Sequence, residues 1–186
     1  MSTTAVVIIV VVVVAIVLVA ALVARPAMRR RRLRETFGPE YDRTVEDTGD
    51  ERRATAELED RRRRHQEFEL RPLSAEHRDR YRQAWSTVQE EFVDSPRDAV
   101  GRADQLIGEV MSDRGYPAGD FDQQAADLSV EHSAVLGHYR KAHTISQRAG
   151  ADTEPASTEE LREALVHYRT LFEDLVEHAT PERSTR

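Results

Sequence analysis

Apolar and polar positions divide this chain into an apolar start and a polar remainder. Residues 5–24 contain only Ala, Val, Ile and Leu, without a charge or a hydroxyl group. A helix of about 20 residues is about 30 Å long, which matches the hydrocarbon core of a bilayer. The pattern therefore predicts a transmembrane helix over residues 5–24, preceded by a short tail of residues 1–4.

Four later segments repeat apolar residues at the spacing of an amphipathic helix. They cover residues 75–93, 96–114, 121–148 and 158–179. Capping residues mark their ends, because Ser side chains accept hydrogen bonds from the free N–H groups of a first turn and Gly ends helices. These markers are Ser74, Ser95 with Asp98, Gly115, Ser157 with Glu160, and Pro181. We predict an all-α fold with an antiparallel bundle of about four helices within residues 71–180 and a disordered tail of residues 181–186.

Two polar segments separate the apolar run from the bundle. Gly38-Pro39 should interrupt any helix that continues from the membrane, because Pro lacks an N–H group and restricts the residue before it. We interpret residues 25–50 as a basic collar and juxtamembrane linker that ends in a loop over residues 46–50. A charged helix is expected over residues 51–70, either packed on the bundle or projecting from it. A short apolar face within the linker would combine Phe37, Tyr41 and Val45.

Positive charge gathers directly after the apolar run. The basic collar consists of Arg25, Arg29, Arg30, Arg31, Arg32 and Arg34. Residues 1–36 hold a balance of +5 within a chain of net charge −7, so residues 37–186 carry −12. By the positive-inside rule, the acidic domain should be cytoplasmic and the short N-terminus outside, with the collar arginines beside anionic lipid headgroups. The sequence predicts a single-pass protein of the cell membrane, with membrane lipid as one partner.

A cleaved signal peptide is the alternative interpretation of the apolar run, and it would make the protein secreted. A signal peptide has a basic start, an apolar region of about 7 to 15 residues and small residues before the cleavage site. Here residues 1–4 carry no basic side chain, the apolar run is longer, and Leu22 occupies a position that favours a small residue. These mismatches favour an anchor.

Composition excludes several kinds of site. The chain has no cysteine, so disulfides, thiolate metal sites and cysteine nucleophiles are excluded. A run of basic residues at 61–65 invites a nucleic-acid interpretation, but acidic residues flank it at helical spacing and the domain as a whole is acidic. We therefore expect no nucleic-acid partner.

Motifs for catalysis or for a bound cofactor are missing from the sequence. It contains no Glu-x-x-His or His-Glu-x-x-His motif, no Gly-rich phosphate loop and no asparagine. Two pairs at i, i+4 spacing, Glu163 with His167 and Asp174 with His178, could hold a metal, but such pairs more often lie exposed on a helix. We predict a protein that is not an enzyme and has no catalytic, cofactor or metal site.

His132 lies in the middle of the apolar seam of residues 121–148, whose spacing by four and three is that of a coiled coil. A histidine in a core can titrate near neutral pH and loosen the packing when it is charged, so His132 is a candidate pH-sensitive core residue. The favoured alternative places it at the edge of the seam with one ring nitrogen in water. Tyr81 and Trp85 are expected to be core residues first and ligand contacts second.

Several short stretches resemble small uncharacterised membrane-anchored or secreted proteins of high-GC actinobacteria. They are residues 37–45, 71–74, 85–89, 92–94 and 114–117, within a similarity that covers about residues 30–145. The resemblance implies no activity. Arg replaces Lys almost throughout, with Lys141 the only lysine, which fits a high-GC genome.

Two functional classes remain open at this point. In the first, the chain is a non-enzymatic membrane-tethered interaction module that docks a protein partner or self-associates. In the second, the bundle binds a small ligand or a metal as a sensor or carrier. An exposed apolar or charged groove would favour the first class, and a concave pocket with converging polar groups would favour the second.

Overall fold

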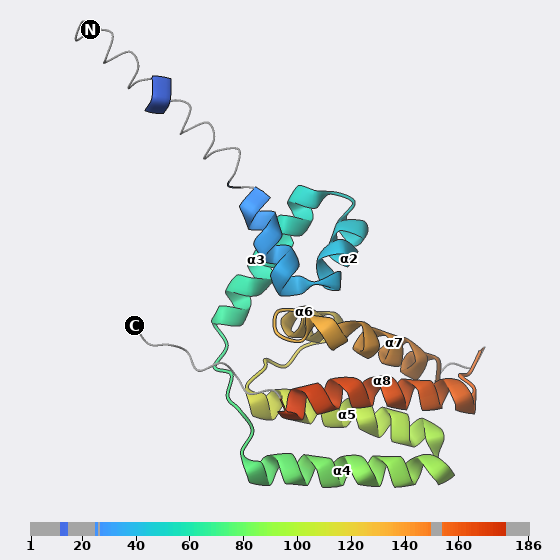
Figure 1. The fold of residues 1–186 in the computed structure, drawn as a ribbon. Helices are drawn as coiled ribbons and strands as arrows, with labels where there is room; N and C mark the ends of the chain where they lie inside the picture. Colours follow the sequence, from blue (N-terminus) through green and yellow to red (C-terminus); the bar gives the residue numbers. More distant parts are fainter. Residues whose placement is uncertain (1–11, 15–24, 26, 150–153, 178–186) are drawn as a thin grey trace, which may run out of the picture. The chain divides into compact units, whose positions relative to one another are not determined.

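The computed structural model describes residues 12–14, 25, 27–149 and 154–177. These residues form helices and connecting turns and contain no strand, so the predicted all-α class is confirmed (Figure 1). The chain divides into two compact units, Met1–Leu58 and Glu59–Arg186. The boundary between them falls within helix α3, which spans Glu51–Gln66.

The first unit has a small apolar core. Residues 27–37 are helical, Gly38 adopts a φ of 49°, and α2 follows over Pro39–Thr48 with its Pro at the first turn. The core side chains are at most 1% exposed and come from these two segments and the first half of α3: Leu33, Phe37, Tyr41, Ala54 and Leu58. The interpretation of residues 25–50 as a linker is therefore wrong, because Leu33, Phe37 and Tyr41 are spaced by four and fold onto α3.

The loop between α2 and α3 is shorter than residues 46–50. Helix α2 continues to Thr48, and Gly49 ends it with a φ of 65° and an N–H that donates to the carbonyl of Val45. The Asp50 carboxylate then accepts from the backbone N–H groups of Arg52 and Arg53, which starts α3. Helix α3 ends at Gln66 rather than at residue 70.

The second unit is a helical bundle, as the periodicity predicted. Its long helices are α4 (Ala75–Asp94), α5 (Pro96–Arg114), α7 (Ser133–Ala149) and α8 (Thr158–Glu177). Successive long helices run in opposite directions; α5 packs between α4 and α8, and α7 packs on α8 (Figure 1). Tyr81 and Trp85 are buried in its core, 3% and 5% exposed.

Three of the predicted helix ends have the expected chemistry. The Ser74 hydroxyl accepts from the N–H of His77, and the Glu160 carboxylate accepts from both the N–H and the hydroxyl of Ser157 in a capping box. Gly115 ends α5 with a φ of 93°. Ser95 precedes α5, but its side chain makes no capping hydrogen bond, so that part of the prediction is wrong.

The predicted helix over residues 121–148 is broken in the structure. Helix α6 covers Phe121–Leu128, and α7 begins only at Ser133. At the break, the buried Ser129 hydroxyl donates to the carbonyl of Ala126, and the His132 carbonyl accepts from the N–H of Leu136 to open α7. No Gly or Pro lies between Leu128 and Ser133, so the composition does not mark the break.

The predicted transmembrane segment lies largely outside the described residues. Of residues 5–24, the structure describes residues 12–14, which are helical. Within the described part of the chain, no helix is both long and apolar enough to cross a membrane. Residues 1–4 and the predicted tail, residues 181–186, also lie outside it.

Candidate functional site

The arginines of the basic collar lie at the start of the first unit. Acidic side chains of the same unit pair with arginines of the collar: Arg30 with Glu51 at 2.7 Å, Arg31 with Glu35 at 2.9 Å and Arg34 with Asp42 at 3.6 Å. Arg34 also lies over the ring of Tyr41 at 4.9 Å. The collar is thus partly tied into the fold, which the charge count alone could not reveal.

Much of the collar nevertheless faces solvent. Arg25, Arg29 and Arg32 have exposed side chains. A shallow concavity of about 490 Å³ lies among Arg30, Arg31, Arg34 and the neighbouring Ala27, Glu35 and Glu51. The arrangement leaves guanidinium groups accessible to anions but offers no closed site.

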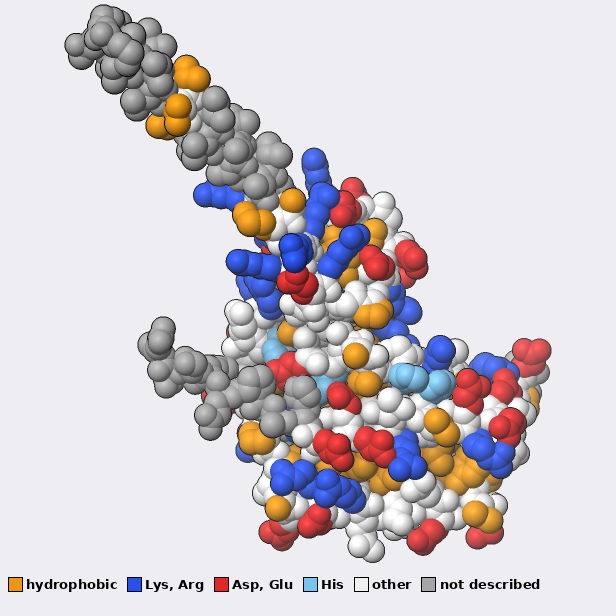
Figure 2. Space-filling model, viewed as in Figure 1, with side chains coloured by type: hydrophobic (Ala, Val, Ile, Leu, Met, Phe, Trp, Pro, Cys, Tyr) orange, Lys and Arg blue, Asp and Glu red, His pale blue; other side chains and the backbone are white. Residues whose placement is uncertain are grey.

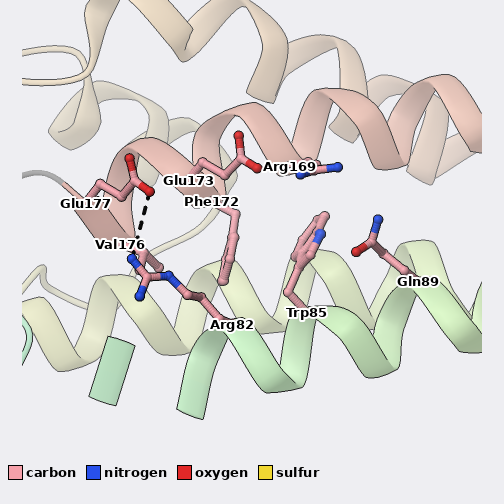
Figure 3. A pocket seen from close by; sticks show the side chains of 8 residues that line it. All are labelled: Arg82, Trp85, Gln89, Arg169, Phe172, Glu173, Val176 and Glu177. Carbon is pink, nitrogen blue, oxygen red and sulfur yellow. Dashed lines mark hydrogen bonds and ion pairs between the residues drawn. The ribbon is translucent and has the colours of Figure 1, made fainter. Parts of the chain in front are cut away.

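A groove runs between α4 and α8 in the second unit (Figure 3). Its volume is about 260 Å³, and its apolar floor comes from Trp85, Phe172 and Val176. The Trp85 and Phe172 rings are stacked, with their centroids 4.7 Å apart at 21°. Trp85 is therefore both a core residue and part of the floor of the groove.

Charged side chains from both helices form the rim of this groove. Arg82 of α4 lies 3.9 Å from Glu177 of α8, and Arg169 pairs with Glu173 at 2.6 Å along α8. All four side chains are 51–69% exposed. The rim carries two positive and two negative charges, so it has no preference for a partner of one sign.

Exposed apolar side chains extend the groove at one end. Val93 and Val166 are 81% and 58% exposed, and they are the large exposed hydrophobic residues among the described part of the second unit. Val93 lies one turn beyond Gln89 on α4, and Val166 lies one turn before Arg169 on α8, where Gln89 and Arg169 line the groove. Because α4 and α8 are antiparallel, both valines lie at the same end.

The space-filling view shows this surface as hydrophobic side chains among acidic and basic ones over α4 and α8 (Figure 2).

One of the residues that line the groove has a buried polar atom without a partner. The indole N–H of Trp85 is buried and has no hydrogen-bond partner among the described residues.

A second cluster is buried inside the bundle around Tyr116. The His132 side chain is fully buried; its Nδ1 is hydrogen-bonded to Asp174, and its Nε2 lies 3.2 Å from the Tyr116 hydroxyl. Tyr116 also donates to Glu131 at 3.5 Å. The expected position of His132 at the seam's edge is therefore wrong, because the break between α6 and α7 directs its ring into the core.

His65 adds a second imidazole to this cluster from the end of α3. Its Nε2 lies 3.8 Å from Glu131, and its ring centroid lies 6.3 Å from that of Tyr116. Burial is the main cause that lowers the pKa of His65, while the nearby Glu131 carboxylate opposes the shift. Burial likewise raises the pKa of the Tyr116 hydroxyl. These groups form an internal polar network rather than an open site.

The network continues on the α6 side. The buried Asp127 carboxylate accepts from Arg64 at 3.0 Å and from the amide of Gln123 at 2.8 Å. No sequence pattern signals this arrangement, because its members lie in segments that only the tertiary fold brings together. Tyr116 and Glu131 were absent from the predicted site residues for that reason.

The sequence offered two candidate metal pairs, Glu163 with His167 and Asp174 with His178, and the structure describes both members of the first pair only. His167 lies 3.3 Å from Glu163 and shares a hydrogen bond of 2.7 Å with His138, whose lowered pKa has burial as its main cause. His178 lies outside the described residues. Among the residues that the structure describes, no group of three or more His, Cys, Asp or Glu could hold a metal ion.

Comparisons with known proteins do not assign this chain to a family. No family model, no curated protein and no solved structure matches this chain. The resemblance to actinobacterial membrane-anchored proteins therefore stays a prediction.

Proposed function

We propose that this protein is a non-enzymatic interaction module, anchored in a membrane by one helix over residues 5–24. In this proposal the basic collar lies at the cytoplasmic headgroups and the helical bundle docks a protein through the groove between α4 and α8. The function is to hold that protein at the membrane surface, where tethering raises its local concentration.

The groove is the observation that supports the docking role. An apolar floor of Trp85, Phe172 and Val176, with a polar rim and exposed valines at one end, has the make-up of a protein-binding face. At about 260 Å³ it is smaller than the usual small-molecule pocket of about 300–1,000 Å³. Protein docking therefore fits this surface better than the alternative of a ligand or metal carrier.

The apolar run and the collar support the membrane role. Twenty apolar residues followed by six arginines match a single-pass helix with its C-terminal side in the cytoplasm. Arg25, Arg29 and Arg32 are exposed and would face lipid phosphates, at up to about 1 kcal/mol for each side chain near the surface.

Site-specific photo-crosslinking in intact membranes tests the docking role. A photoreactive amino acid in place of Val166 should give a discrete crosslinked product. The same amino acid in place of Lys141, which is exposed on α7, should give little. Equal crosslinking from both positions, or none from position 166, would contradict the proposal.

A further inference from the structure

We propose that the occupant of the groove between α4 and α8 is a second copy of this chain, docked through the same groove by a two-fold axis. This inference rests on the proposed docking role and names its partner. The register of the two helices and the signs of the charges on the rim support it.

The register follows from contacts within one copy. Arg82 lies level with Glu177, and Trp85 lies level with Phe172, because these residues touch across the groove. Val93 and Val166 both lie toward the other end of the groove, since α4 and α8 are antiparallel (Figure 1). At each position along the groove, a side chain of α4 therefore lies beside a side chain of α8.

Consider a two-fold axis that lies in the interface between the two copies and runs parallel to α4 and α8. Rotation about this axis leaves the position of each residue along the helices unchanged. It places α4 of one copy over α8 of the other, with antiparallel directions. Arg82 then lies opposite Glu177 of the second copy, and Val93 lies opposite Val166 of the second copy. Each contact occurs twice, as an isologous interface requires.

The charges on the rim are self-complementary in this arrangement. Arg82 and Glu177 pair within one copy at 3.9 Å, which is a loose contact between side chains that are 52% and 69% exposed. Arg82 also pairs with Asp79 along α4 at 3.2 Å, between side chains that are 52% and 76% exposed. Exposed pairs of this kind contribute little to stability, so Arg82 and Glu177 can turn toward a second copy at small cost. A foreign partner of one strong charge would find no match, because the rim is balanced.

The size of the surface predicts a weak dimer. Two helices of about 20 residues offer a face about 30 Å long and about 20 Å wide, so about 1,200 Å² would be buried in total. That area is at the lower end for specific interfaces. The net charge of −12 on residues 37–186 also opposes association. Concentration in a membrane would offset both effects.

A charge exchange between copies tests the arrangement in the full chain reconstituted into lipid vesicles. Two populations with different fluorophores at the C-terminus should show energy transfer that survives dilution with lipid. Arg82→Glu alone should weaken association about tenfold or more, because the glutamate introduced at position 82 would face Glu177 of the other copy at both contacts. Glu177→Arg alone should do the same, because the arginine introduced at position 177 would face Arg82.

A mixture of the two variants should restore energy transfer. In that mixed pair, the introduced glutamate of one chain faces the introduced arginine of the other, and the unchanged Glu177 of the first faces the unchanged Arg82 of the second. A variant that merely failed to fold would not be rescued by mixing. No transfer in the wild-type chain, or transfer that neither substitution weakens, would overturn the two-fold arrangement.

Disulfide crosslinking gives an independent check, because the natural chain has no cysteine. Chains with Val93→Cys mixed with chains with Val166→Cys should form a linked dimer. A mixture of Lys141→Cys and Val166→Cys should not. If position 166 crosslinks to a different protein and the two variants do not link, then the docking role survives and self-association is wrong. If neither occurs, both proposals fail.

Discussion

Tyr116 and His132 share a buried hydrogen bond of 3.2 Å that joins the segment after α5 to the break between α6 and α7. The Tyr116 hydroxyl also reaches Glu131, so it links a histidine and a carboxylate that have little access to water. Loss of this hydroxyl would remove one hydrogen-bond partner from the buried His132 ring and one from Glu131.

Tyr116→Phe should therefore lower the free energy of unfolding by about 1–3 kcal/mol, the cost of unsatisfied buried polar groups. Tyr81→Phe is a matched control, since its hydroxyl donates at 2.6 Å to Asp113, a half-buried carboxylate that water can solvate in its place. The control should cost about 1 kcal/mol or less. Urea unfolding of the full chain in detergent measures both, and equal losses would contradict a special role for Tyr116.

The pKa of His65 predicts how stability depends on pH. Burial lowers its pKa in the folded state below the ordinary value of 6.5, so the unfolded chain binds the proton more readily. The folded state should lose stability as the pH falls through 6.5 and should reach a plateau below the lowered folded-state pKa. His65 should contribute no such slope well above pH 6.5.

His65→Gln should flatten this part of the stability profile, as measured by urea unfolding between about pH 5 and pH 8. Phe68→Leu is the control, because Phe68 packs beside His65 with ring centroids 5.5 Å apart but does not titrate. It should lower stability by a similar amount at every pH. An unchanged slope in His65→Gln would assign the pH dependence to other groups.

Gly115 should tolerate no side chain. Its φ of 93° is strained for other residues, and a Cβ atom would lie 2.5 Å from the carbonyl oxygen of Glu69. We expect Gly115→Ala to cost about 1–3 kcal/mol of stability. Gly108→Ala, in the middle of α5 with open space around it, should instead stabilise the bundle by about 0.5–1 kcal/mol. Thermal unfolding of both variants distinguishes the two sites.

The helices of the bundle could be predicted because their signals are local. Apolar positions at helical spacing, Ser74, the capping box of Ser157 and Gly115 defined both ends of α4 and α5 and the start of α8 to within about two residues. The break after Leu128 could not be predicted, since a buried Ser129 and a set of tertiary hydrogen bonds stabilise it where no Gly or Pro stands.

The first unit and the candidate sites show a different limit. The spacing by four marked Phe37 and Tyr41 as a short apolar face, but it missed Leu33, which lies one turn earlier among the arginines. It also could not show that Ala54 and Leu58 of α3 belong to the same small core. The Tyr116 network and the groove each join residues from distant segments. Periodicity identified Trp85 as a core residue, and the packing of α4 on α8 places this buried side chain beneath a groove.

The collar should set the orientation of the anchor. Replacement of Arg25, Arg29 and Arg32 by Gln keeps the ion pairs of Arg30, Arg31 and Arg34. It removes half of the positive charge of the basic collar. By the positive-inside rule, the share of chains with a cytoplasmic C-terminus should fall. Replacement of the same number of arginines at positions 61–63 should leave the orientation unchanged. Protease protection of an epitope at the C-terminus measures that share.

The location of the C-terminus in intact cells tests the central claim most directly. A fusion at Arg186 to a reporter that is active only in the cytoplasm should be active, and the full-length chain should stay with the membrane after alkaline extraction. Activity of a reporter that works only outside the cell, or a mature protein that begins at Arg25, would contradict a bundle held at the inner face of a membrane.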